Sequence, residues 1–351
     1  MPPLINALKP TDLEDLSRFL TAGFGTSPHA VFAAPDVLRW KYLEPINGEE
    51  MLPRSYVARD EQGVIIGHVG ICRTAFEGGS LPGGRVPTLH MIDWLGSPGH
   101  RTVGASLMRK AHEGVPTQFG LGGSAAGRAV IKRGGYEPRE PVSVYQRVLR
   151  PGFWLRSPAP SPASLRKLAR LARGLGGNLL HRPARSTVAL ELREVPSFGP
   201  EIEAILEIAR QHAILTSRSS ARLNHLLRFP RGGFSGWHIV GNARLRGFAI
   251  LALVPQKTGG VVVGKVVDCL LDTTDPASWQ AAFLALAREL GRRGSDIAQT
   301  FAGTPWTAKA LQTSGFTCRF SLEFNVRDRE GRIPSGVPFH LMPIEADYAY
   351  T

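Results

Sequence analysis

The stretch SPGHRTVGAS, residues 97–106, decides how the first half of this 351-residue chain folds. It follows an apolar run, TLHMIDWL (88–95), and it contains two glycines, a proline and a basic pair. Downstream, Val103, Leu107 and Ala111 recur at the spacing of one helix face. The stretch is therefore predicted to be a turn that joins a strand to a helix. Such a turn serves either chain geometry alone or the binding of a phosphate, and its neighbours must decide between the two.

The start of the predicted helix has the physical properties of an anion site. Backbone N–H groups in the first turn of a helix have no intrahelical acceptor, and the helix dipole adds about half a positive charge there. Gly104 lets a pyrophosphate approach the backbone, and Arg101 supplies charge-assisted hydrogen bonds. Residues 101–106 thus suit a pyrophosphate site, but taken alone they fit a plain connecting turn better, and the neighbouring stretches are needed to favour the site.

Composition bounds the class of protein. The length suits about two domains, and 43% hydrophobic with 20% charged residues is typical of a globular chain. A net charge of +13 favours anionic partners, among them nucleotide phosphates, acidic sugars, nucleic acid and lipid surfaces. Cys72, Cys269 and Cys318 lie far apart and outside any metal motif, so neither a zinc site nor a disulfide scaffold is expected. No metal is predicted.

Targeting signals are not evident in the sequence. The N-terminus lacks a basic start followed by an apolar stretch, which argues against a signal peptide. The longest apolar runs, near 248–255 and 261–268, are too short to span a bilayer. A cytoplasmic protein without a transmembrane segment is therefore expected.

The first half, residues 1–150, shows alternating helix and strand patterns. The predicted order is a strand, two helices, three strands, a helix, a strand, a helix and a final strand. The three consecutive strands are expected at 55–60, 64–76 and 88–95. This order indicates an α/β fold, of the α+β type with a mixed sheet.

Residues 151–185 differ in composition from the flanking halves. A proline- and serine-rich break leads into an arginine-rich segment in which Leu165, Leu168 and Leu175 share a face. We interpret it as a linker whose helix packs on a neighbouring domain. A basic amphipathic helix also suits an anionic membrane surface, so peripheral contact through 165–175 is the alternative.

From 186 to 351 the first pattern returns. RLNHLLRFP (222–230) resembles RWKYLEP (39–45) in ending an apolar helical turn at proline, and Asp268 ends its apolar run as Asp93 does. These echoes indicate a weak internal repeat. The turn after Asp268, CLLDTTDPASWQ, contains no glycine. The second half is therefore expected to lack the anion site of the first.

The first half resembles the GNAT acetyltransferase superfamily. In that family the acyl-CoA loop reads Arg or Gln, two residues, Gly, one residue, then Gly or Ala. Here the loop is occupied by Arg101, Thr102, Val103, Gly104, Ala105 and Ser106, and the last departs from the small apolar preference. The WKYL, MIDWL and AVIKRGGY stretches add to the resemblance, which covers residues 4–150 and, weakly, 190–330.

The resemblance is strongest to tandem-domain proteins associated with polysaccharide biosynthesis. It implies two GNAT-like domains, of which the second is degenerate and does not bind CoA. It also implies that the backbone of Trp94, Leu95 and Gly96 pairs with the pantetheine arm of acetyl-CoA or another acyl-CoA. Ser124 stands where relatives often have an asparagine that touches CoA, although an N-cap role explains it equally well.

The family's reaction is direct attack of an amine on the thioester, which requires a base. Asp93 is a candidate base, or else an aspartate satisfied by backbone amides. His90 is a candidate for the base or a substrate contact, or else an ordinary half-buried histidine. Strict strand alternation places the two on opposite faces unless a bulge intervenes. The family's usual tyrosine acid is replaced by Ile131, which leaves Tyr136, a water or direct thiolate release.

Three functions fit these observations. The first is an acyl-CoA-dependent N-acyltransferase, of the acetyl type, that acts on a small amine or an amino sugar in surface-polysaccharide synthesis. The second is a Fem-type transferase that takes an aminoacyl group from tRNA, the one case in which a nucleic-acid partner is expected. The third is a degenerate acyl-CoA-binding scaffold or sensor.

Overall fold

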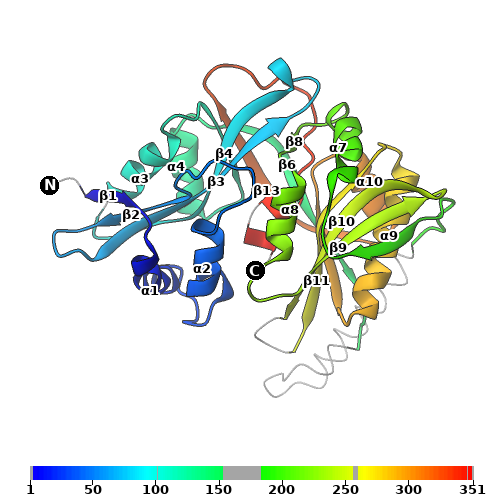
Figure 1. Cartoon of the computed structure of the whole chain (residues 1–351), viewed down its shortest axis with the longest axis horizontal. Helices are drawn as coiled ribbons and strands as arrows, with labels where there is room; N and C mark the ends of the chain where they lie inside the picture. The colour runs from blue at the N-terminus through cyan, green and yellow to red at the C-terminus, as the bar shows by residue number, and fades with distance from the viewer. Residues whose placement is uncertain (1–2, 101, 153–182, 256–259, 346, 350–351) are drawn as a thin grey trace.

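The computed structural model describes residues 3–100, 102–152, 183–255, 260–345 and 347–349. Within them, thirteen strands form one mixed sheet in the order β1-β2-β3-β4-β5-β13-β6-β12-β11-β10-β9-β7, with β8 paired to β3 (Figure 1). Helices cover both faces, which confirms the predicted mixed α/β class.

The first half has the predicted order of elements. They are β1 (Leu4–Ala7), α1 (Leu13–Gly23), α2 (Pro35–Tyr42), β2 (Ser55–Arg59), β3 (Ile65–Glu77), β4 (Arg85–Gly96), α3 (Val103–His112), β5 (Thr117–Leu121), α4 (Ala125–Arg133) and β6 (Glu137–Val148).

The second half repeats this order with an additional short strand. Its elements are β7 (Glu191–Val195), α7 (Glu203–Arg210), β8 (Leu215–Thr216), α8 (Ser220–Leu227), β9 (Phe234–Gly241), β10 (Arg244–Pro255), β11 (Val262–Leu271), α9 (Pro276–Arg292), β12 (Ile297–Ala302), α10 (Pro305–Thr313) and β13 (Thr317–Asp328). Two short 3-10 turns follow, η5 (Pro343–Glu345) and η6 (Asp347–Ala349).

The sheet order is symmetric about its centre. Reading outward from β13 and β6, each strand of one half has its counterpart at the same position in the other half, from β5 and β12 to β1 and β7. The last strands are exchanged between the halves. β13 pairs with β5 of the first half, and β6 pairs with β12 of the second. The two halves therefore share one continuous sheet.

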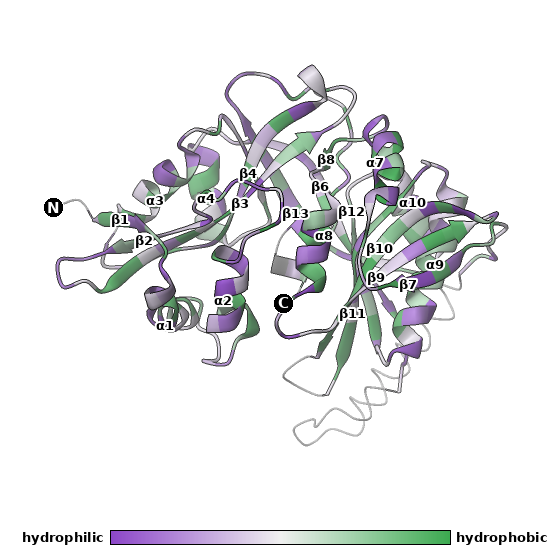
Figure 2. Cartoon of the chain, viewed as in Figure 1, coloured by the Kyte–Doolittle hydropathy of each residue, from purple (hydrophilic) through white to green (hydrophobic). Residues whose placement is uncertain are grey.

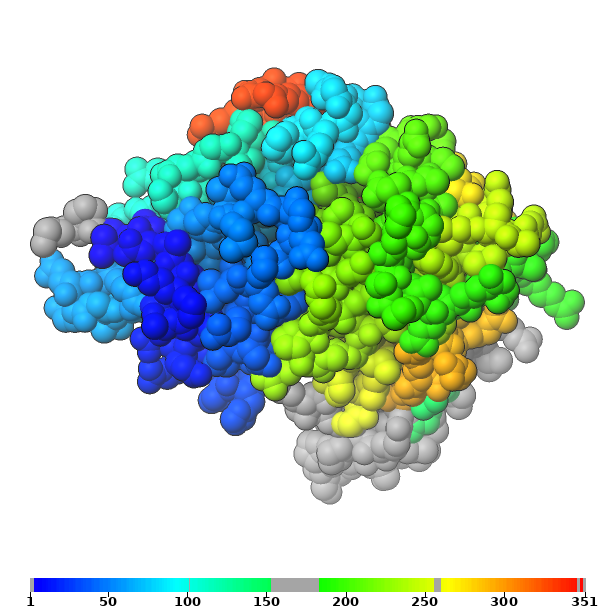
Figure 3. Space-filling view, viewed as in Figure 1, coloured from blue at the N-terminus to red at the C-terminus, as the bar shows by residue number. Residues whose placement is uncertain are grey.

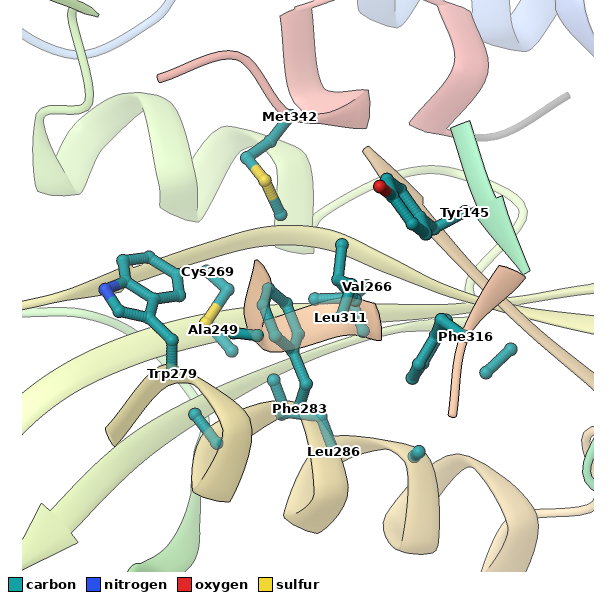
Figure 4. Packing of buried hydrophobic residues seen from close by; sticks show 14 of the residues in the cluster. Tyr145, Ala249, Val266, Cys269, Trp279, Phe283, Leu286, Leu311, Phe316 and Met342 are labelled. Carbon is teal, nitrogen blue, oxygen red and sulfur yellow. The ribbon is translucent and has the colours of Figure 1, made fainter. Parts of the chain in front are cut away.

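Two sets of helices cover opposite faces of this sheet. On one face α2, α7 and α8 bury a cluster that contains Val37, Leu206 and Leu223 together with Phe248 of β10. On the other face Trp279, Phe283 and Leu286 of α9 point toward Ala249, Val266 and Cys269 (Figure 4). β10 and β11 are mostly hydrophobic along their length (Figure 2), as expected for strands covered on both faces.

Alternate residues of one strand supply the two cores. In β10, Phe248 and Ile250 enter the first cluster, whereas Ala249 and Leu251 enter the second. Each fully buried phenylalanine, isoleucine or leucine side chain contributes roughly 1.5–3 kcal/mol relative to exposure. No helix in the described part of the chain is long and apolar enough to cross a membrane. The segment 165–175, predicted to be a basic helix, lies outside the described residues.

Candidate active site

A β-bulge in β4 sets the position of Asp93. His68 of β3 pairs with Leu95 and Gly70 pairs with Ile92, so two residues of β4 oppose one of β3. Asp93 has a φ of 48°, in the left-handed region that aspartate tolerates better than most residues. The bulge interrupts the strict alternation that would separate His90 from Asp93.

Side chains of α2 hold the Asp93 carboxylate. Its Oδ2 atom accepts hydrogen bonds from Lys41 Nζ and, at 2.6 Å, from the Tyr42 hydroxyl, and all three groups are buried. A Cβ on Gly70 would lie only 2.3 Å from the Tyr42 oxygen, so a glycine is needed under that hydroxyl. The carboxylate is thus held by two side chains, whereas the alternative expectation was backbone amides.

A buried histidine fixes the backbone at the bulge. His68 Nδ1 lies 2.8 Å from the Asp93 carbonyl oxygen and therefore donates to it. In the neutral ring Nε2 then accepts, and the Ser55 hydroxyl donates to it at 2.8 Å. The strained residue is therefore held through its carbonyl as well as its carboxylate.

β4 and β5 are paired over a short parallel stretch and then diverge. The pairs run from Thr88 with Thr117 to His90 with Phe119. At the last pair, His90 Nδ1 donates to the Phe119 carbonyl at 3.0 Å, and the two rings stack with centroids 4.7 Å apart. In the neutral ring His90 Nε2 is then the basic nitrogen. This places His90 at the point where the two strands part.

The turn after β4 brings the strand end against the start of α3. A Cβ on Gly96 would come within 3.3 Å of the Gly104 nitrogen, and Trp94 Nε1 donates to the Gly104 carbonyl at 3.1 Å. Thr102, which precedes α3, gives no side-chain cap in the described structure. Arg101 lies outside the described residues.

Gly104 has no packing reason to be glycine. A Cβ there would meet the Trp94 ring at 3.8 Å, which is ordinary contact, and the residue is helical. Glycine within a helix costs roughly 1 kcal/mol relative to alanine. No contact within the described part of the chain therefore requires a glycine at this position.

The other predicted cofactor residues are placed as follows. Val103, the first residue of α3, is buried in the hydrophobic core, and the Leu95 side chain packs over Gly23. Ala105 is exposed, and Ser106 donates its backbone N–H to the Thr102 carbonyl at 3.0 Å. Ser124 caps α4 by accepting from the Gly127 N–H at 3.1 Å. Its N-cap role is thus present, whereas a contact with CoA stays a prediction.

Tyr136 lies in a different environment from the diverging strands. Its hydroxyl is 2.9 Å from His112 Nε2 at the end of α3, and its ring is buried. Burial raises the pKa of Tyr136 above its usual range and lowers the pKa of His112 to about 4. This arrangement is that of a packed, neutral pair.

The second half repeats the bulge with a different charge partner. Ile250 of β10 pairs with Asp268 and Leu251 pairs with Val266, which leaves Val267 as the extra residue of β11. Asp268 accepts from Arg218 Nε at 2.9 and 3.2 Å. Burial opposes the charge on Arg218, but Asp268 and Glu345 raise its pKa above the usual range.

The space between β11 and β12 is filled by the chain itself. The two strands pair only from Val263 to Lys265, the same length as the pairing of β4 with β5. Beyond it, His340 Nε2 donates to the Cys269 carbonyl at 3.0 Å. A Cβ on Gly303, which follows β12, would lie 2.5 Å from the Phe339 carbonyl oxygen. Residues 339–341 thus lie in the gap between β11 and β12. They do not enter the corresponding gap between β4 and β5 in the first half.

The start of α9 is likewise occupied. Asp275 accepts hydrogen bonds from the Ala277 and Ser278 N–H groups at 3.2 and 2.9 Å. A carboxylate at this helix start satisfies the first-turn amides and repels a phosphate. The two halves therefore share the same arrangement of strands and helices but differ at the gap between the parallel strands and at the start of the following helix.

A cleft of about 210 Å³ opens between the halves. Figure 3 shows the first-half surface in blue against the second-half surface in green along this seam. Ile92 and Phe119, from the two diverging strands, reach it from the first half, and α8 and Glu345 form the opposite wall. Its charged lining residues are Lys41, Glu49, Glu50, Arg54, Arg73, Arg218, Arg222 and Glu345.

Several of these cleft residues do not belong to any motif that the sequence alone reveals. Asp268 was singled out as an echo of Asp93, but nothing near it in sequence pointed to Arg218 or Glu345 as its neighbours. Within the described residues, no group of three or more His, Cys, Asp or Glu side chains gathers at metal-binding distance.

Comparison with known proteins identifies the fold. No protein-family model and no curated protein sequence matches the chain. A GCN5-related N-acetyltransferase from Anabaena variabilis is 15% identical, with a TM-score of 0.60 over 93% of this chain and 73% of its own. Saccharomyces cerevisiae N-myristoyltransferase with bound myristoyl-CoA is 10% identical, with a TM-score of 0.63 over 93% of this chain and 82% of its own.

A third structure agrees with these two. A probable N-acyltransferase from Enterococcus faecalis is 14% identical, with a TM-score of 0.57 over 94% of this chain and 73% of its own. At such identities the likeness shows the fold. The chain has the GNAT fold that the sequence predicted, and the likeness spans both halves.

Proposed function

We propose that this protein is an acyl-CoA-dependent N-acyltransferase with one acyl-CoA site, in its first half. The fold supports the general activity, because the structures it resembles include N-acetyltransferases and an N-myristoyltransferase that holds myristoyl-CoA. The site is the turn between β4 and α3 together with the gap between β4 and β5. The finer proposal is transfer of an acetyl group to a small amine or an amino sugar in polysaccharide synthesis.

The difference between the two halves carries this proposal. Both contain a bulge with a buried aspartate, a short parallel strand pair and a following helix. In the second half residues 339–341 lie between the diverging strands, and Asp275 occupies the start of the helix. In the first half the divergence reaches the cleft at Ile92 and Phe119, and Gly104 is the second residue of α3. One half is therefore built to accept a ligand where the other is closed.

The residues of the turn would hold the nucleotide end of acyl-CoA. The amides of Gly104 and Ala105 would face the pyrophosphate, because they lie in the first turn of α3, whereas the Val103 N–H donates to the His100 carbonyl at 3.1 Å. Arg101 and Thr102 would supply the side chains nearest to it. The backbone of Trp94 to Gly96, left unpaired with β5, would pair with the pantetheine arm.

The chemistry of the site suits attack by an amine. The bound co-substrate supplies the thioester, and the chain must supply a base and donors for the developing negative charge on oxygen. His90 stands at the divergence with Nε2 as its basic nitrogen. Asp93 lies three residues further on, held by Lys41 and Tyr42. We propose His90 as the base and Asp93 as the residue that orders α2 beside the acceptor.

Placing a negative charge at position 104 tests the cofactor site. Gly104→Asp fits sterically and suits a helix start, so the fold should persist while acetyl-CoA is repelled. Ala277→Asp places the same charge at the start of α9 and is the matched control. Calorimetric titration with acetyl-CoA should show binding to wild type and Ala277→Asp and at least tenfold weaker binding to Gly104→Asp. Equal binding by all three proteins contradicts the proposed site.

A further inference from the structure

Arg54 is a cleft cation without a carboxylate partner in the described structure. It lies just before β2, and its Nη2 donates to the Glu44 backbone carbonyl. It forms no ion pair with any acidic residue that the structure describes. The side chain is half-buried, and burial lowers its pKa from the usual value. A partly desolvated guanidinium is stabilised when an anion pairs with it.

Three of the other basic residues of the cleft are paired with carboxylates, whereas the structure describes no such pair for Arg73. Lys41 pairs with Asp93, and Arg218 pairs with Asp268 and Glu345. Arg222 Nη2 donates to Glu49 at 3.0 Å. Arg54 and Arg73 are the two basic lining residues of the cleft for which the structure describes no ion pair.

The surroundings of Arg54 place it on the acceptor side. The Ile71 N–H donates to the Arg54 backbone carbonyl at 2.7 Å, which places Arg54 beside Cys72. Burial, followed by the charge of Arg54, lowers the pKa of His225 to about 4. Cys72 and His225 line the same cleft, and Cys72 lies opposite His90 in the β3–β4 register. Arg54 is therefore close to the face of the sheet that carries His90, the candidate base. The start of α3, in contrast, follows the last residue of β4.

A neutral polar group lies beside this cation. His225 is nine-tenths buried, and its Nδ1 has no hydrogen-bond partner in the described structure. Its Nε2 is 3.3 Å from the Trp40 carbonyl and so carries the proton, which makes Nδ1 an acceptor. The wall near Arg54 thus offers a cation and a hydrogen-bond acceptor.

We infer that Arg54 binds an anionic group on the acceptor, so that the preferred substrate is an amine that also carries a phosphate or a carboxylate. This rests on the proposed acyltransferase function, since it assigns the cleft to the acceptor. A guanidinium binds both oxyanions through paired N–H donors, which a glutamine in its place does not reproduce. An amino sugar phosphate and an amino acid are the two chemical forms of such an acceptor.

The first test measures anion binding without turnover. Inorganic phosphate and acetate are titrated in thermal-shift experiments with CoA at saturation, on wild type, Arg54→Gln and Arg147→Gln. Arg147 is the matched control, because it is half-buried, donates to a backbone carbonyl at 3.0 Å and lies outside the cleft. At least one anion should raise the Tm of wild type and Arg147→Gln and raise that of Arg54→Gln less. Equal shifts in all three overturn the inference.

The second test compares acceptors that differ only in the anionic group. Thiol release from acetyl-CoA is followed with glucosamine 6-phosphate against glucosamine, and with L-alanine against L-alaninamide. Arg54→Gln should raise KM for the anionic member of the preferred pair at least about tenfold and leave KM for the neutral member within about twofold. The preferred pair distinguishes phosphate from carboxylate. Equal KM changes for both members contradict a role for Arg54 in charge recognition.

Calorimetry with acetyl-CoA separates failure of this inference from failure of the proposed function. If Arg54→Gln binds acetyl-CoA like wild type but anion binding is unchanged, the acyltransferase proposal stands and the role of Arg54 falls. If wild type does not bind acetyl-CoA, the proposed function fails. If Arg54→Gln alone loses acetyl-CoA, Arg54 belongs to the cofactor site and the inference is overturned.

Discussion

Trp40 of α2 and His225 of α8 donate hydrogen bonds to each other's backbone carbonyls across the junction of the two halves. Trp40 Nε1 is 3.1 Å from the His225 oxygen, and His225 Nε2 is 3.3 Å from the Trp40 oxygen. Their rings stack with centroids 4.9 Å apart and planes within 3°. The reciprocal pattern follows the symmetry of the fold, because α2 and α8 are equivalent helices. The pair fixes both walls of the cleft.

Removing the indole donor should loosen that junction. Trp40→Phe keeps an aromatic ring but leaves the His225 carbonyl without its donor, so the free energy of unfolding should fall by about 1–3 kcal/mol. Trp279→Phe is the control, because Trp279 donates to the Thr273 carbonyl within the second half. Hydrogen exchange should quicken in α8 for Trp40→Phe and not for Trp279→Phe. Unchanged exchange in α8 would show that the pair does not hold the junction.

The buried Lys41–Asp93 pair predicts strong coupling between the two residues. Asp93→Asn removes the charge while asparagine tolerates the left-handed backbone, and it leaves the Lys41 ammonium without its carboxylate. Each of Asp93→Asn and Lys41→Met should lower the unfolding free energy by about 3–5 kcal/mol. The double variant should lose clearly less than the sum of the two. Urea unfolding of all four proteins measures this, and additive losses would argue against a direct pair.

Sequence reasoning found the repeat because its signals are local. Aligning the two helices at Pro45 and Pro230 matches Trp40 with His225, which are the residues the structure brings into contact. The aspartates at 93 and 268 likewise both stand at bulges. These patterns can be recognised in the sequence because each depends on only a few neighbouring residues.

The rest depends on contacts between distant parts of the chain. The exchange of β6 and β13 is a choice of strand partner, which alternation within a strand does not encode. Arg218 has no neighbouring motif, and its role follows from Asp268 and Glu345, which lie 50 and 127 residues away. The same holds for residues 339–341, because no local sequence pattern predicts that they lie between β11 and β12.

The closed second half predicts one acyl-CoA per chain. Calorimetry with acetyl-CoA should give a stoichiometry near one for wild type. Asp275→Ala removes the side chain that occupies the start of α9, and should lower stability by about 1 kcal/mol through loss of the cap. The stoichiometry should not change, because Phe339 and His340 still lie between the strands. A second bound acyl-CoA in either protein would contradict the assignment of a single site.

Buried histidines predict a loss of stability in mild acid. Burial, followed by the nearby Arg218, lowers the pKa of His340 to about 3, and burial lowers that of His225 to about 4. As the pH falls below about 6.5 the unfolded chain takes up protons at these positions and the native chain does not, so the free energy of unfolding decreases. Stability should be fully retained above that pH and should fall progressively toward pH 4.

His340→Gln tests this dependence with little change in shape. The glutamine amide can donate to the Cys269 carbonyl as His340 Nε2 does. Between pH 7 and pH 5 the variant should lose about 2 kcal/mol less unfolding free energy than wild type, measured by urea denaturation at each pH. His29→Gln, at an exposed loop position, is the control and should follow wild type. Parallel pH curves for His340→Gln and wild type would mean that His340 accepts its proton in the folded chain.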